Sequence, residues 1–180
     1  MKSIHKEMSV QEVAVVVANR LESQGIWAVL VGGSCVTIYS KNQFMSYDLD
    51  FVSYDPLSKI KEALGELGFV YDKKKYFVHP ECAYFLDFLT PPVAIGNEPV
   101  STFSTMVSPL GELQLLTPTD CVKDRLAAFY HWGDLQSLDQ AVCVAKEQKV
   151  ELSEITRWSE NEKNRDKCKE FLKLMNEEKT

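Results

Sequence analysis

The spacing of apolar residues predicts alternating helices and strands over the first part of the chain. Apolar side chains recur every three or four positions after Ser9, a capping residue, and this pattern ends at Gly25, which predicts a first helix. The continuous apolar run at 27–31 predicts a buried strand, and the alternation of apolar and polar residues at 47–52 predicts a second strand. A further helix is expected at about 56–67.

The segment that follows predicts short strands separated by turns. The β-like runs are found at 76–78, 83–89, 101–107 and 112–116. Between them, residues 90–99 contain three prolines and one glycine, so we expect a loop that is ordered only by what it packs against.

From Thr117 onward the pattern becomes helical. Thr117-Pro118-Thr119-Asp120 combines a capping hydroxyl, a proline at the first helical position and an acid three residues after the cap, which marks a helix start. Apolar stripes continue to an amphipathic last helix around Phe171. We therefore expect an α/β (α+β) fold, in which a mixed sheet flanked by helices forms residues 1–116 and a helical segment over residues 117–180 packs on this core.

The composition is that of a globular protein with an acidic balance. The chain has 180 residues, 45% of them apolar and 26% charged, and 20 Lys and Arg against 26 Asp and Glu give a net charge of −6. This charge argues against broad non-specific binding of nucleic acid, although it leaves room for a local basic patch. No apolar run approaches the ~20 residues of a membrane span, and no signal peptide is recognisable. The five cysteines are scattered and odd in number, so we expect reduced thiols in a cytoplasmic protein.

Two motifs carry the candidate chemistry. Gly32-Gly33-Ser34 follows the first predicted strand and leads into a short helix, and a diglycine there lets backbone N–H groups approach a phosphate. Asp48 and Asp50 are two residues apart on the second predicted strand, so their side chains point to one face, while Leu49 and Phe51 point into the core. Such a pair of like charges favours a cation such as Mg²⁺, which prefers hard oxygen ligands. Taken singly, each motif is more often structural than functional.

In this order and at this spacing, the two motifs resemble the signature of the DNA polymerase β-type nucleotidyltransferase superfamily. The resemblance implies a minimal nucleotidyltransferase fold and a third carboxylate on a later strand. Asp87, an acid in an otherwise apolar run, stands at such a position, and a water-facing acid on an edge strand is the alternative. The runs 87–99 and 117–132 are similar to those of small prokaryotic nucleotidyltransferase-fold proteins related to AbiEii-type abortive-infection toxins.

The resemblance further implies Mg²⁺-dependent transfer of a nucleoside monophosphate from an NTP to an acceptor hydroxyl, with release of pyrophosphate. Two Mg²⁺ ions would be held by Asp48, Asp50 and Asp87, which are also the implied catalytic residues. The nucleotide would be bound by the glycine turn, two serines and two cations of the helical segment, namely Gly32, Gly33, Ser34, Ser46, Lys123 and Arg125. An exposed helix turn is the alternative explanation for the two cations.

The acceptor stays open between the 3′ end of an RNA such as tRNA, a protein side chain and a small molecule. The tie to toxins also implies an antitoxin-type protein partner, and no membrane contact is expected. Two other functions remain as alternatives. One is a non-catalytic nucleotidyltransferase-fold binding protein, and the other is an aminoglycoside-type small-molecule nucleotidyltransferase with an acidic cleft for a cationic substrate. The stretch 81–120, which has five acids and no Lys or Arg, is compatible with the latter.

Overall fold

The computed structural model describes residues 4–73 and 75–177. The strands are β1 (Val29–Val31), β2 (Asp48–Val52), β3 (Val70–Tyr71), β4 (Phe77–Val78), β5 (Phe85–Leu89), β6 (Ala94–Ile95), β7 (Glu98–Pro99), β8 (Phe103–Ser108) and β9 (Gly111–Leu116). The helices are α1 (Val10–Ser23), α2 (Gly33–Tyr39), α3 (Leu57–Gly65), α4 (Pro118–Trp132), α5 (Leu135–Glu147), α6 (Leu152–Asn161) and α7 (Arg165–Asn176). Helices and strands therefore alternate up to β3, strands follow one another from β3 to β9, and the elements described after β9 are helices.

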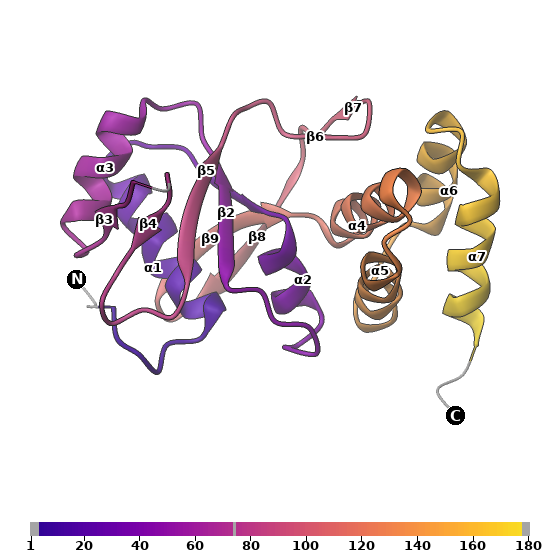
Figure 1. The fold of residues 1–180 in the computed structure, drawn as a ribbon, viewed down its shortest axis with the longest axis horizontal. Coiled ribbons are helices and arrows are strands. Elements are labelled where there is room, and N and C mark those ends of the chain that lie inside the picture. The colour runs from indigo at the N-terminus through magenta and orange to yellow at the C-terminus, as the bar shows by residue number, and fades with distance from the viewer. Residues whose placement is uncertain (1–3, 74, 178–180) are drawn as a thin grey trace.

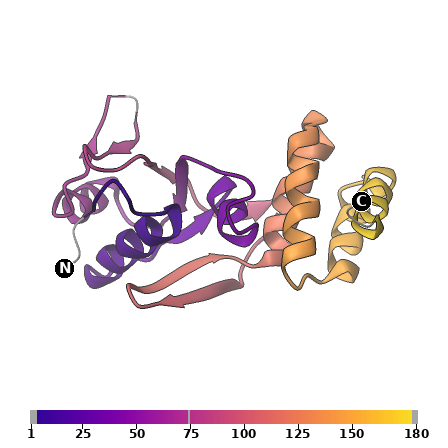
Figure 2. The same cartoon turned by 90° about the horizontal axis from the view of Figure 1, so that it is seen from below.

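Seven strands form one mixed sheet with the order β3-β4-β5-β2-β1-β9-β8, and β6 and β7 form a separate two-stranded hairpin (Figure 1). β2 lies in the middle of the sheet, antiparallel to β1 and parallel to β5. α1 packs against β9 and α3, whereas α2 contacts β1, β2, α4 and α5. In Figure 1, α1 and α3 lie at one end of the molecule and α4 to α7 at the other, with α2 and β2 between them. Figure 2 shows β8 and β9 as a long two-stranded ribbon.

The predicted helix starts are confirmed, and their caps explain them. The Ser9 hydroxyl accepts the Glu12 N–H, while the Glu12 carboxylate accepts the Ser9 N–H (2.8 Å), which is a complete capping box at the start of α1. The Thr117 hydroxyl accepts the Asp120 N–H (3.0 Å), and Pro118 is the first residue of α4. These local signals fix where each helix begins.

Four elements lie outside the sequence prediction, namely β3, α6, β6 and β7. The two-residue strand β3 is too short to show a period, and α6 was expected only as part of a continuously helical region. Within residues 90–99, expected to be a loop, β6 and β7 pair across a turn formed by Gly96 and Asn97. Gly96 has φ 59°, a left-handed conformation that favours glycine.

The C-terminal helices have their own buried residues. Trp158 of α6 and Phe171 of α7 are both fully buried, and α5, α6 and α7 contact one another or α4. Within the described ranges, none of the helices has both the length and the apolar character needed to cross a bilayer.

Candidate active site

The turn after β1 brings the backbone of Gly32 against the carboxylate of Asp50. Gly32 has φ 69° and ψ −148°, a conformation that essentially only glycine adopts. A Cβ atom built on Gly32 would lie 2.7 Å from Asp50 Oδ2, so no side chain fits at this position. A Cβ built on Gly33 would lie 3.1 Å from Ser46 Oγ, which is also a tight contact. The diglycine therefore permits a close approach between this turn and β2.

Asp50 and Asp87 are neighbours on adjacent strands. β2 and β5 pair in parallel with Asp50 opposite Asp87, and Asp48 lies two residues before Asp50 on the same strand. Because paired residues of parallel strands point to the same face, the three side chains share one face of the sheet. Leu49 and Phe51 on the opposite face are fully buried, as the alternation predicted.

Ser34 and Ser46 both contact the backbone of Asp48. The Ser34 hydroxyl donates to the Asp48 carbonyl oxygen (2.7 Å), and the Ser46 hydroxyl donates to the same oxygen (3.1 Å). Ser34 is fully buried. These hydrogen bonds fix the start of β2 and hence the position of its carboxylates. The predicted contact of either serine with a nucleotide stays a prediction.

The charges around Asp50 change its acidity. Burial, together with the negative charges of Asp48 and Asp87, raises the pKa of Asp50 to about 6. Arg125 opposes this rise, and Asp124 adds to it. Arg125 is itself paired with Asp124, with 3.1 Å between Nε and Oδ2. The sequence analysis assigned no role to Asp124. Its position between Lys123 and Arg125, both predicted to bind the nucleotide, was the one sequence feature that could have pointed to it.

A cleft of about 340 Å³ adjoins Asp50. Its lining combines the site residues with the β6-β7 hairpin and the segment before it, and the residues are Val31, Gly32, Asp50, Val52, Leu89, Thr90, Pro92, Val93, Ala94, Ile95, Leu116, Asp124 and Arg125. Asp87 lines a smaller neighbouring cleft of about 200 Å³, which shares Leu89 and Thr90 with the first. Asp50 and Asp87 therefore line two different clefts, which meet at Leu89 and Thr90.

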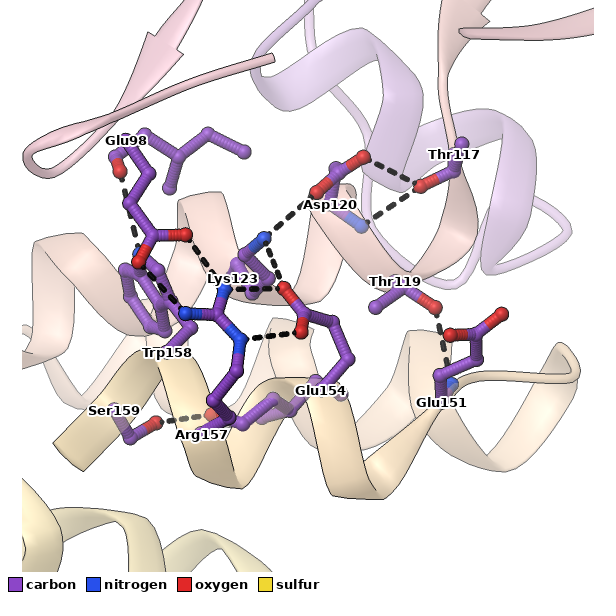
Figure 3. Close-up of polar contacts among 12 residues, drawn as sticks. Glu98, Thr117, Thr119, Asp120, Lys123, Glu151, Glu154, Arg157, Trp158 and Ser159 are labelled. Atoms are coloured by element: carbon purple, nitrogen blue, oxygen red, sulfur yellow. Dashed lines mark hydrogen bonds and ion pairs between the residues drawn. The ribbon is translucent and has the colours of Figure 1, made fainter. Parts of the chain in front are cut away.

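The two predicted cations of α4 have different surroundings. Arg125 lines the cleft beside Asp50, whereas Lys123 is only 6% exposed and does not line it. The Lys123 ammonium donates to Asp120 Oδ1 (3.0 Å) and to Glu154 Oε1 (3.2 Å), as Figure 3 shows. Residues two apart on a helix face different directions, which explains the separation. The structure therefore brings Arg125 to the carboxylates and leaves Lys123 in an ion-pair cluster between α4 and α6.

The carboxylates fit Mg²⁺ by their chemistry. Over residues 4–73 and 75–177, no three His, Cys, Asp or Glu side chains are close enough together to make a ready-formed metal site. Asp87 Oδ1 accepts the N–H of Phe88 (2.8 Å), so this carboxylate lies against its own strand. The oxygen donors are nevertheless of the kind that Mg²⁺ prefers. The pKa of Asp50 is raised by burial and then by repulsion from Asp48 and Asp87, and a cation would relieve this repulsion. Metal binding by Asp48, Asp50 and Asp87 stays a prediction.

Comparison with known proteins identifies the fold. No family model and no curated protein matches this sequence. Among solved structures, the chain is similar to the crystal structure of an antigenic nucleotidyltransferase-like protein from Paracoccidioides brasiliensis, with a TM-score of 0.57 and 15% sequence identity. The match covers 78% of this chain and 77% of that one. The relation to AbiEii-type proteins stays a prediction, whereas the expected fold class is confirmed: the chain has a nucleotidyltransferase-like α/β fold.

Proposed function

We propose that this chain is a Mg²⁺-dependent nucleotidyltransferase that moves a nucleoside monophosphate from an NTP to an acceptor hydroxyl. The register of β2 and β5 carries the proposal, because it sets Asp50 opposite Asp87. The contact of the Gly32 backbone with the Asp50 carboxylate supports it further, since the phosphate-binding turn and the metal ligands of such an enzyme must adjoin each other.

Each site residue has a proposed role. Asp48, Asp50 and Asp87 hold two Mg²⁺ ions, while the backbone N–H groups of Gly32 and Gly33 bind the β- and γ-phosphates. Mg²⁺ bound at these carboxylates would neutralise the negative charge on the departing pyrophosphate. Arg125 is the cation of α4 that lines the cleft, so it is a better candidate for the triphosphate than the buried Lys123.

The proposed reaction is an in-line displacement at the α-phosphorus. The acceptor oxygen forms a bond to this phosphorus, and the bond from the phosphorus to the oxygen bridging to the β-phosphate breaks. The electron pair of that bond leaves with pyrophosphate. Asp87 takes the proton of the acceptor hydroxyl as a general base.

The charges of the cleft favour a small cationic acceptor as a second candidate. The charged residues in its lining are Asp50, Asp124 and Arg125, and the arginine is already paired with Asp124. Asp48 and Asp87 add two further negative charges on the same face of the sheet. Such a surface attracts a polyamine-like or aminoglycoside-like acceptor and repels the phosphates of a long RNA.

The proposed function is tested by transfer of label from each of the four NTPs, labelled at the α-phosphate, in the presence of Mg²⁺. Total RNA, total protein and a set of aminoglycosides serve as acceptors. The native chain is compared with Asp50→Asn, which keeps the shape of the side chain, and with Asp139→Asn, an exposed acid on α5. Label transferred by the native chain and by Asp139→Asn, but not by Asp50→Asn, supports the proposal, and the labelled fraction identifies the acceptor.

If the native chain transfers no label, a second measurement is needed. If no acceptor is labelled, calorimetric titration with Mg²⁺ and with each NTP decides between the remaining functions. Binding of both without transfer would favour a non-catalytic binding protein, and binding of neither would overturn the proposal.

A further inference from the structure

The hairpin that walls the cleft is held by a distant helix. Val93, Ala94 and Ile95 line the cleft beside Asp50, and they belong to or adjoin the β6-β7 hairpin. This hairpin is a sheet of its own and pairs with no strand of the seven-stranded sheet. Two strands of two residues each are too short to be stable alone in water, so the position of this wall depends on contacts outside the hairpin.

The tip of the hairpin contacts Glu162, the residue that follows α6. Glu162 Oε1 accepts the backbone N–H of Asn97 (2.8 Å), and both of its carboxylate oxygens accept from Asn97 Nδ2 (3.3 Å each). The Glu162 side chain is only 2% exposed. A Cβ built on Gly96 would lie 2.5 Å from this carboxylate, so the turn and the carboxylate are closely fitted. The Trp158 indole N–H also donates to the Ile95 carbonyl oxygen (3.3 Å).

The second strand of the hairpin is held by Arg157 of α6. Arg157 Nη1 donates to Glu98 Oε1 (3.0 Å) and Nη2 donates to Glu98 Oε2 (2.7 Å), a bidentate pair that Figure 3 shows together with its neighbours. Asn161 Nδ2 donates to Glu98 Oε1 as well (3.0 Å). Glu98 therefore has two partners from one helix.

Arg157 is oriented by the ion-pair cluster described above. Its Nε donates to Glu154 Oε2 (2.7 Å), and Glu154 in turn accepts from Lys123 of α4 (3.2 Å). A continuous chain of charged side chains thus connects the hairpin, α6 and α4 (Figure 3). α4 also carries Arg125 and Asp124, which line the same cleft. The hairpin and the side of the cleft formed by Asp124 and Arg125 are consequently attached to one group of packed helices.

We propose that Arg157 and its ion-pair partner Glu98 are positioning residues for nucleotide binding. They hold the β6-β7 hairpin at the distance from Asp50 that a bound nucleotide requires, although neither residue lines the cleft. This inference rests on the proposed function, because it assigns the cleft to the nucleotide. If the wall is released, it samples open positions, and the nucleotide must order it again on binding, which weakens the affinity.

The test compares Arg157→Gln and Glu98→Gln with a matched control. The control is Arg165→Gln, which removes an exposed arginine of α7 that pairs with Glu160 (3.5 Å) and has no contact with the hairpin. Binding of each Mg·NTP is measured by calorimetry, and deuterium uptake is measured for the peptide 92–100. We expect Arg157→Gln and Glu98→Gln each to weaken nucleotide binding roughly tenfold and to speed exchange in this peptide, since each removes a charge-assisted bidentate contact.

A double variant separates positioning from general destabilisation. If the two residues act through their contact, Arg157→Gln combined with Glu98→Gln should weaken binding no more than either single change. Arg165→Gln should alter neither readout. Faster exchange of 92–100 with unchanged nucleotide affinity would overturn the positioning role alone. Unchanged exchange in both single variants would do the same, and absence of nucleotide binding by the native chain would overturn the proposed function together with this inference.

Discussion

Replacing Asp50 by asparagine removes a charge that destabilises the folded chain. Burial and the neighbouring carboxylates Asp48 and Asp87 raise the pKa of Asp50 from 3.8 to about 6. A carboxyl group with a raised pKa is harder to ionise in the folded chain than in the unfolded one. At neutral pH, where Asp50 is ionised in both states, the difference appears as lost stability. Asp50→Asn keeps the size of the side chain and removes this loss, so the variant should unfold at a higher temperature.

The magnitude follows from the same pKa. A rise from 3.8 to about 6 corresponds to at most about 3 kcal/mol. The side chain is only partly buried, so solvent screens part of this energy and about 1–2 kcal/mol is expected. For a chain of this length, each kcal/mol shifts the melting temperature by roughly 2–4 °C. We therefore expect Asp50→Asn to raise the melting temperature by roughly 2–8 °C at pH 7.5.

The pH dependence of unfolding provides a second check that Asp50→Asn stabilises the folded chain. Between pH 3.8 and about 6 the unfolded chain has already lost its proton at Asp50 while the folded chain retains it, so the stability of the native chain falls as the pH rises through this window. Asp50→Asn has no such proton. The difference in melting temperature between variant and native chain should be small near pH 4 and reach its full value above about pH 6.5.

Thermal unfolding followed by circular dichroism in EDTA, from pH 4 to pH 8, measures this difference. Asp139→Asn on α5 is the control and should follow the native curve, because this acid is exposed. Mg²⁺ added in place of EDTA should stabilise the native chain and reduce its difference from Asp50→Asn. A variant that is less stable than the native chain at pH 7.5, or a difference independent of pH, would refute the reasoning.

Four other substitutions test single contacts. Gly32→Ala should lower the free energy of unfolding in urea by about 2–4 kcal/mol, because its Cβ would meet Asp50, whereas Gly133→Ala, with φ 67° and no atom within 4 Å, should lower it by only about 1 kcal/mol. Lys123→Met should lower the same free energy by roughly 1–3 kcal/mol, since Asp120 loses its cationic partner while Glu154 keeps Arg157. It should raise the KM for NTP less than Arg125→Met does, because Lys123 acts only through Glu154 and Arg157 whereas Arg125 lines the cleft; steady-state kinetics measures both values. The hydrogen bond from Arg157 holds the pKa of Glu98 down to about 2. The ion pair therefore stabilises the folded chain fully above pH 4.5, and this stabilisation is lost as the pH falls towards 2. When the pH is lowered from 4.5 to 2, the melting temperature of Glu98→Gln should therefore fall less than that of the native chain. Equal falls would contradict a stabilising ion pair between Glu98 and Arg157.

Local patterns were sufficient for the elements that depend on near neighbours. The capping box of Ser9 and Glu12 fixes the start of α1 within four residues of chain. The alternation of Asp48 and Asp50 with Leu49 and Phe51 assigns each side chain to a face of β2, and the structure buries the two apolar residues fully. In both cases the physical cause lies within one helical turn or one strand, which a sequence pattern can reveal.

The features that the sequence did not predict depend on contacts between distant residues. The prolines around residues 90–99 indicated a loop, yet Glu98 and Asn97 are held by Arg157 and Glu162, about 60 positions further along the chain. Lys123 was expected to bind the nucleotide or to lie on an exposed helix turn, but it is buried and one of its two carboxylate partners, Glu154, is 31 residues away. No local period records such pairings, so the hairpin wall and the burial of Lys123 required the structure. The expectation that segment 90–99 is ordered by its packing partner agrees with these contacts.

The stability and the chemistry of the site have one physical origin. Burial and the repulsion from Asp48 and Asp87 raise the pKa of Asp50, so the proton and a divalent cation compete for the same carboxylate. A cation that binds there must displace the proton below about pH 6, and it relieves the repulsion above it. The buried side chains of Leu49 and Phe51 and the hydrogen bonds of Ser34 and Ser46 hold β2 in place against this repulsion. The strand can thus keep its carboxylates together before any ligand arrives, which lowers the cost of assembling the site on binding.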